Sequence, residues 1–229
     1  MSPTFIVSYD GTDTDRDALA LGRLLRDAGA AGGLAYVRHA RASDPVQEIL
    51  EAQQAAKLLE RAAHIVGAPQ SEQHVIVHAS TGEGLRELVA RHGTDIVVFG
   101  PDYRTADGTV RPGTSAQRLL NGGPAAVALA PAGLRDRPRA IARVGVLAEA
   151  GDGAAAETAA ALARALHAEV AAPGASFDLL VVGSRPEGRI GRVALSAVAE
   201  YEIETSAVPV LVVPRGAAVH FPEPTLAAA

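Results

Sequence analysis

The chain has 229 residues, of which 48% are hydrophobic, so it is long enough to form one large or two small folded domains. Its net charge of -5 provides no basic field, which argues against binding to nucleic acid or to an anionic membrane. The sequence contains no cysteine, which excludes disulfides, thiolate metal sites and a cysteine nucleophile.

The first residues, MSPTFIVSYDG, enter a predicted strand within a few positions. They lack the charged segment and long apolar run of a secretory signal. No apolar run in the sequence reaches the roughly 18 residues that a membrane span requires. We therefore expect a cytoplasmic protein that does not contact a membrane.

Short β-branched segments alternate with helical periodicity over residues 1–131, which is typical of a parallel sheet with crossover helices. Strands are predicted at residues 5–10, 33–39, 74–79, 95–100 and 125–130. Helices are predicted at residues 15–28, 45–66, 83–92 and from residue 115. In the long helix the apolar positions are spaced to pack on the sheet; they are Ile49, Leu50, Leu58, Leu59 and Ala62. Residues 1–131 therefore predict a complete five-stranded α/β domain.

Residues 131–139 contain two prolines and four charged residues, and we interpret residues 132–139 as a linker. After it the pattern restarts, with strands predicted at residues 142–150, 177–183 and 208–214 and helices at 154–168 and 193–204. We expect a truncated second domain at residues 140–216 and a C-terminal tail at 217–229. The predicted fold class is thus α/β, with two tandem Rossmann-like open parallel sheets.

The spacing of matching residues indicates an internal duplication. Asp10 and Gly100 end strands 90 positions apart, whereas Glu149 and Gly183, their counterparts, are 34 positions apart. The second copy is therefore 56 residues shorter in the region that holds strand two, the long helix, strand three and the next helix. Beyond it the copies match again, because Gly113 lies 13 positions before the strand at Ala126, as Ser196 does before Pro209.

Ligands of open parallel sheets bind beyond the carboxyl ends of the strands, where Asp10, Gly11 and Gly100 are expected. The helix that begins at residues 113–115 presents backbone N–H groups to an anion, and the loop at residues 101–112 is expected to wrap the phosphates. The same residues are also compatible with an ordinary turn and an ordinary helix cap, so spacing alone leaves both interpretations open.

The segments FIVSYDGTDTDRDALALGRLL, TDIVVFG with GTSAQRLL, and FDLLVVGSRPEGRIGRVALSAVAEYEIETSAVPVLVVPRG resemble the universal stress protein (UspA) family. The resemblance spans nearly the whole chain as two tandem units, and it depends on the order and spacing of the motifs together. It implies ATP, with magnesium, as a possible ligand of the first unit. The nucleotide-binding positions that it implies are Asp10, Gly11, His39, Gly100, Tyr103, Gly113, Thr114 and Ser115.

The chain departs from the family pattern at two places in the first unit. Tyr103 replaces the second glycine of the motif, and Asp107 stands in a loop where the family has glycines and basic residues. The second unit departs further, and its matching positions are occupied by Glu149, Pro186, Ser196 and Ala197. We therefore expect no nucleotide in the second unit.

Other kinds of site are less well supported by the sequence. His74 and His78 would lie about 13 Å apart on a strand, too far to share a metal, so no metal site is expected. Lys57, the single lysine, follows no glycine-rich loop, which excludes a Walker-type phosphate site. Ser115 lies in no nucleophile elbow, and we expect no enzyme activity.

Two functions therefore remain open. One is a stress-response protein that senses a nucleotide, and the other is a scaffold of the same fold that acts through dimerisation and an unknown protein partner. The family pairs through its last strands, so residues 125–130 and 209–214 are expected to meet within the chain as a pseudo-dimer, or between copies as a homodimer.

Overall fold

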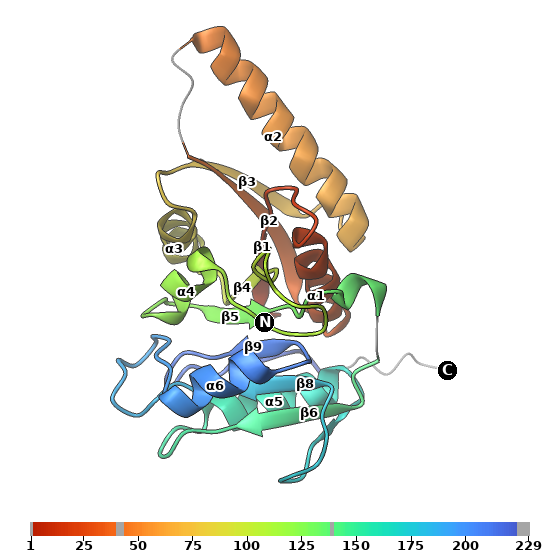
Figure 1. Ribbon diagram of the computed structural model, residues 1–229, viewed down its shortest axis with the longest axis vertical. Coiled ribbons are helices and arrows are strands. Elements are labelled where there is room, and N and C mark those ends of the chain that lie inside the picture. Colours follow the sequence, from red (N-terminus) through yellow and green to blue (C-terminus); the bar gives the residue numbers. More distant parts are fainter. Residues whose placement is uncertain (1, 40–43, 138–139, 224–229) are drawn as a thin grey trace.

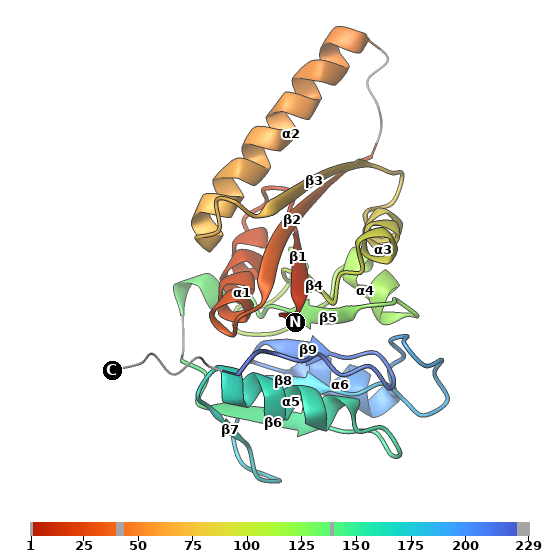
Figure 2. The same ribbon diagram turned by 180° about the vertical axis from the view of Figure 1, so that it is seen from behind.

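The computed structural model describes residues 2–39, 44–137 and 140–223. These residues form one nine-stranded sheet of order β3-β2-β1-β4-β5-β9-β8-β6-β7 with helices on both faces (Figure 1; Figure 2). The predicted α/β class is confirmed, and the two predicted sheets are continuous with each other.

The first unit holds five parallel strands in the order β3-β2-β1-β4-β5. The strands are β1 (Thr4–Ser8), β2 (Ala31–Arg38), β3 (Glu72–Val77), β4 (Ile96–Phe99) and β5 (Ala126–Leu129). The helices are α1 (Asp15–Asp27), α2 (Pro45–Val66), α3 (Thr81–His92) and α4 (Thr114–Leu120). Each predicted element of this unit is present, because apolar strands and amphipathic helices alternate clearly in the sequence.

The second unit holds four parallel strands and two helices. The elements are β6 (Arg143–Leu147), α5 (Ala154–Ala165), β7 (Glu169–Val170), β8 (Leu179–Val182), α6 (Ala197–Thr205) and β9 (Val210–Val212). β7 pairs parallel with β6, as β2 pairs with β1. The inference that the second copy had lost strand two was therefore wrong, since a two-residue strand remains at that position.

The two units join where β5 and β9 pair antiparallel, with Val127 opposite Val212. Both side chains are fully buried, with 0% exposure. Each strand would otherwise present an unpaired apolar edge to solvent. Their pairing within one chain therefore covers the edge of both units.

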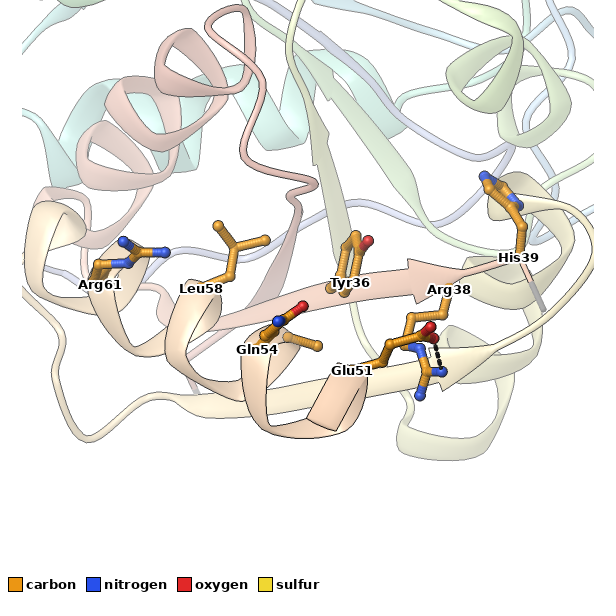
Figure 3. Close-up of a pocket in the computed structure, with 8 residues that line it drawn as sticks. Tyr36, Arg38, His39, Glu51, Gln54, Leu58 and Arg61 are labelled. Carbon is orange, nitrogen blue, oxygen red and sulfur yellow. Dashed lines mark hydrogen bonds and ion pairs between the residues drawn. The ribbon is translucent and has the colours of Figure 1, made fainter. Parts of the chain in front are cut away.

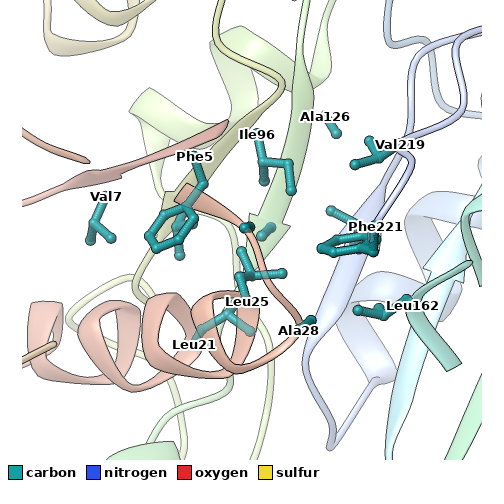
Figure 4. Packing of buried hydrophobic residues seen from close by; sticks show 14 of the residues in the cluster. Phe5, Val7, Leu21, Leu25, Ala28, Ile96, Ala126, Leu162, Val219 and Phe221 are labelled. Atoms are coloured by element: carbon teal, nitrogen blue, oxygen red, sulfur yellow. The ribbon is translucent and has the colours of Figure 1, made fainter. Parts of the chain in front are cut away.

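The C-terminal segment packs between the units. Val219 and Phe221 belong to the same buried cluster as Leu25 of α1, Ala28 directly after α1, and Leu162 of α5 (Figure 4). The N–H group of Val219 also donates a hydrogen bond to Oγ1 of the buried Thr158 at 2.9 Å. Residues 217–223, expected to be a tail, therefore contribute to the core that the two units share.

The predicted linker docks on α1. Its short 3₁₀-helix η1 (Leu134–Asp136) follows Gly133. The carboxylate of Asp17, only 2% exposed, accepts hydrogen bonds from the N–H groups of Gly133 and Arg135, both at 2.9 Å. The described part of the linker is thus fixed to the first unit by a buried acidic side chain.

Helix α2 projects beyond the sheet in its N-terminal half (Figure 1). Its buried residues all lie from the middle of the helix onward; they are Ala55, Leu59, Ala62, Ala63 and Val66. Ile49 and Leu50 are 59% and 54% exposed, so the prediction that these two pack on the sheet was wrong. A 22-residue helix is about 33 Å long and extends past the strands that it covers. Neither α2 nor any other described helix has the length and apolarity to cross a membrane.

Candidate functional site

A cavity of about 480 Å³ opens beyond the carboxyl ends of β1 and β4. Seven of the eight predicted site residues line it; they are Asp10, His39, Gly100, Tyr103, Gly113, Thr114 and Ser115. The eighth, Gly11, lies beside the cavity and has a positive φ of 87°. A Cβ atom at this position would lie 2.8 Å from Cδ1 of Leu58, so Gly11 shapes the turn against α2.

Gly100 and Gly113 both line the cavity, but the need for a glycine is different at the two positions. A Cβ atom at Gly100 would lie 2.5 Å from the carbonyl oxygen of Thr14, so this glycine allows β4 to end against the start of α1. Gly113 has extended backbone angles, and the nearest atom to a Cβ there would be Oδ2 of Asp102 at 3.8 Å. The space at Gly113 is therefore open to a ligand, whereas Gly100 is explained by packing.

Two carboxyl groups face the cavity side by side. Oδ2 of Asp15 accepts hydrogen bonds from the N–H groups of Asp10 and Gly11 at 2.6 and 3.2 Å. Oδ1 of Asp10 accepts one from the N–H group of Thr12 at 3.0 Å. The sequence indicates Asp15 only as the first residue of a helix, so its place in the cavity could not be predicted from it.

The environment separates the acidities of these two groups. Burial raises the pKa of Asp15 to about 7, and its hydrogen bond to the Asp10 carboxyl adds to this rise. Burial acts in the same direction on Asp10, but hydrogen bonds from Asp15 and Thr12 outweigh it and hold the pKa of Asp10 below its ordinary value. The pair therefore shares a proton below neutral pH and approaches a double negative charge above it.

Aromatic and hydroxyl groups form the remaining walls. The aromatic residues are Tyr9, Tyr36, Phe99 and Tyr103, and the hydroxyl residues are Ser8, Thr12, Thr14, Thr81, Thr114 and Ser115. Tyr103 is 73% exposed, and the guanidinium group of Arg104 lies 4.8 Å from the centre of its ring. Tyr103 thus stands at the rim and leaves the cavity open. None of the described lining residues is Lys or Arg.

The loop at residues 101–112 lines the cavity only at its start, through Pro101 and Tyr103. Its ends are joined by a bridge between Pro101 and Pro112. The N–H group of Gly108 donates to the carbonyl of Ala132 at 2.9 Å, and that of Val110 to the carbonyl of Ser206 at 3.0 Å. The expectation that the whole loop wraps phosphates was therefore wrong, because its central part is bound to the linker and to the second unit.

Asp107 contributes to this arrangement. Its carboxylate lies 2.6 Å from the guanidinium group of Arg137 in the linker. The acidic residue that departs from the family pattern thus has a structural partner. Both groups are largely exposed, so the pair adds little to stability.

A second cavity, of about 630 Å³, adjoins the first between β2 and α2 (Figure 3). Tyr36 and His39 line both cavities. Arg38, 6% exposed, donates hydrogen bonds to Glu48 at 2.9 and 2.8 Å and to Glu51 at 2.5 Å. Its buried charge is therefore compensated by carboxylates of the helix.

The matching position in the second unit is closed. Oγ of Ser196 donates a hydrogen bond to Oε1 of Glu149 at 2.5 Å and accepts one from the N–H group of Ala199 at 3.2 Å. These side chains occupy the places that correspond to Gly113 and Asp10. The second unit thus fills with its own groups the space that the first unit leaves open.

Comparisons with known proteins agree with this architecture. The model of the Universal stress protein family matches residues 174–214. A universal stress protein from Archaeoglobus fulgidus shares 15% identity and a TM-score of 0.70, over 94% of this chain and 100% of its own. A functionally unknown protein from Pseudomonas aeruginosa matches with 13% identity and a TM-score of 0.57. The match covers 94% of this chain and 93% of that protein. No curated protein matches the sequence.

A third structure is a universal stress protein from Archaeoglobus fulgidus in complex with dAMP. It shares 14% identity and a TM-score of 0.34 and covers 43% of this chain and 80% of its own. The comparisons thus show that this chain has the fold of the first two structures over nearly its whole length, and that residues 174–214 match the Universal stress protein family model.

Proposed function

We propose that this chain is a universal stress protein, and that it binds an adenine nucleotide or a related nucleoside in the cavity of its first unit as a sensor in a stress response. The observation that carries the proposal is the gathering of seven predicted residues around one cavity at the carboxyl ends of β1 and β4. Binding without turnover is sufficient for this role.

The chemistry of the walls suits a nucleoside. Tyr36 and Phe99 offer flat apolar surfaces for a base. The carboxyl groups of Asp10 and Asp15 can accept hydrogen bonds from amino and hydroxyl groups of such a ligand. The hydroxyl groups of Thr114 and Ser115, which also line the cavity, can donate hydrogen bonds to a phosphate.

Charge limits the number of phosphates that the cavity favours. Asp10 and Asp15 carry negative charge at neutral pH, and no Lys or Arg is among the described lining residues. A triphosphate would meet this charge without a cationic partner, unless magnesium neutralises part of it. We therefore propose that a nucleoside or its monophosphate binds more tightly than ATP, and that ATP binds as its magnesium complex.

A ligand at this site could act on the linker. Asp13 follows the cavity residue Thr12, and its carboxylate receives a hydrogen bond from Arg135 at 2.6 Å. Arg135 also lies 3.7 Å from the carboxylate of Asp17 in α1. A ligand that reorients residues 10–15 would thereby change how the linker docks on the first unit. This connection gives the sensor a route from the cavity to the second unit.

Calorimetric titration of the purified chain with adenosine, AMP and Mg·ATP tests the proposal. We expect one site per chain, with AMP or adenosine binding more tightly than Mg·ATP. Absorbance at 260 nm in the purified protein reports a ligand retained from the cell, and the four tyrosines and absent tryptophan keep the protein contribution low. Absence of heat and of thermal stabilisation with all three ligands would contradict the proposal.

A scaffold without a nucleotide is the alternative. Three apolar side chains on the projecting half of α2 favour it, since Val46, Ile49 and Leu50 are 73%, 59% and 54% exposed. Exposed apolar groups that lie close together are common at protein interfaces. A failure of all three ligands to bind, together with a dimer in analytical ultracentrifugation that Leu50→Glu disrupts, would favour the scaffold.

A further inference from the structure

Two histidines from different elements meet at the outer edge of the first unit. His74 lies in β3 and His92 ends α3, and their ring centres are 4.8 Å apart with an angle of 61° between the planes. The sequence analysis had compared His74 with His78 along the strand. Nδ1 of His78 instead accepts from the N–H group of Ser80, so His78 belongs to the start of α3.

A carboxylate completes the group. Glu72 precedes His74 by two positions, and alternate residues of a strand share a face. Oε2 of Glu72 lies 3.4 Å from Nε2 of His74. One potential ligand atom from each of Glu72, His74 and His92 lies within 4.8 Å of the other two.

The buried member of the group has an unsatisfied polar atom. Nε2 of His74 is shielded from solvent, and it has no well-formed hydrogen bond among the described residues, because the nearest carboxylate oxygen, Oε2 of Glu72, lies 3.4 Å away. A buried polar atom without a partner costs free energy.

We propose that Glu72, His74 and His92 bind a divalent transition metal ion, for which Zn²⁺ is the best fit. Two imidazoles and one carboxylate are ligands that zinc accepts, with a fourth position left to water. Tetrahedral coordination brings ligand atoms to roughly 3.3 Å from one another. Glu72 and His92 are exposed and can rotate by the small amount that this requires.

The position in the fold gives the metal a mechanical role. β3 is the outermost strand of the first unit, and His92 lies at the end of α3. A metal held by both would fasten the edge strand β3 to the C-terminal end of α3. Thr81, which lines the nucleotide cavity, is the first residue of α3, so the two sites lie at opposite ends of this helix. The metal proposal is thus independent of the nucleotide proposal.

Calorimetric titration of the full chain with zinc sulfate tests the site, after treatment with EDTA and without a polyhistidine tag. We expect saturable binding of one ion per chain and a rise in the thermal unfolding temperature. His92→Gln and Glu72→Gln should each weaken binding by at least about tenfold, because each removes a ligand. Both residues are exposed, so neither change should impair folding.

His64→Gln is the matched control, because His64 is an exposed histidine near the end of α2, outside the group. It should leave the affinity for zinc unchanged. Equal unfolding temperatures of all variants in EDTA would show that the fold is intact. Zinc binding that His92→Gln leaves unchanged, or no saturable binding to the wild type, would overturn the proposal.

Discussion

The hydroxyl group of Ser196 donates a hydrogen bond to the carboxylate of Glu149, and these two residues stand where the first unit has Gly113 and Asp10. The same fold is therefore open in one copy and closed in the other. Ser196 also accepts from the N–H group of Ala199, so it caps α6. Ser196 thus both fills the space where a ligand could bind in the second unit and stabilises α6.

Ser196→Ala should lower the free energy of unfolding by about 1 kcal/mol, because it removes this cap. Urea denaturation followed by circular dichroism measures the effect. Glu200→Gln, an exposed change in the same helix, should alter stability by less than about 0.5 kcal/mol. Equal losses in the two variants would contradict the role of Ser196.

Asp15 should make stability depend on pH. Its pKa is raised from 3.8 to about 7 in the folded chain, so folding binds a proton that the unfolded chain releases. The stability from this proton is present below pH 3.8 and is lost as the pH rises through about 7. We expect the free energy of unfolding to fall over this range and Asp15→Asn to flatten the profile.

Denaturation with urea at a series of pH values checks this prediction. Asp27→Asn provides the control, because Asp27 is an exposed acid at the end of the same helix. In this control the free energy of unfolding should depend on pH as steeply as in the wild type. A slope that persists in Asp15→Asn but disappears in Asp27→Asn would show that another group is responsible.

Asp17 should be the main attachment of the linker. Asp17→Ala leaves the N–H groups of Gly133 and Arg135 without their buried acceptor and should cost roughly 3 kcal/mol in unfolding free energy. Asp13→Ala removes only an exposed partner of Arg135 and should cost less than about 1 kcal/mol. Proteolysis near the linker should accelerate in the first variant. An equal response of the two variants would refute this assignment.

Phe221 should stabilise both units together. Its ring is 6% exposed and packs in the core shared by α1 and α5, so Phe221→Ala should cost about 3 kcal/mol in unfolding free energy. Tyr201→Ala removes a ring that is 66% exposed and should have an effect of less than about 0.5 kcal/mol. Thermal denaturation of both variants measures these effects. Similar losses of stability in Phe221→Ala and Tyr201→Ala would show that the C-terminal segment is not packed in the core.

The order of elements could be predicted from the sequence, because β-branched strands and amphipathic helices give distinct periodicities. Gly113 and Ser196 lie the same number of positions before the strands that follow them, and this equal spacing also indicates the duplication. β7 was missed because a strand of two residues has no periodicity. Its place became visible only through its pairing with β6.

The candidate site was predictable only in part. Asp10 and Gly113 follow from motif spacing, whereas the pairing of Asp10 with Asp15 depends on how the turn between them folds. His74 and His92 are neighbours only because α3 returns along the sheet to β3. Ile49 is exposed because α2 is longer than the sheet that it covers. The periodic pattern of apolar residues in a helix carries no information about the size of the sheet.

The most direct measurement is a calorimetric titration of AMP into the wild type, Gly113→Val and Ser196→Val. A side chain at residue 113 meets no atom closer than 3.8 Å and the backbone there is extended, so Gly113→Val should fold and fill the cavity. We predict one site in the wild type, an affinity at least about tenfold weaker in Gly113→Val, and unchanged binding in Ser196→Val. Binding that survives in Gly113→Val but is lost in Ser196→Val would contradict the assignment of the site to the first unit.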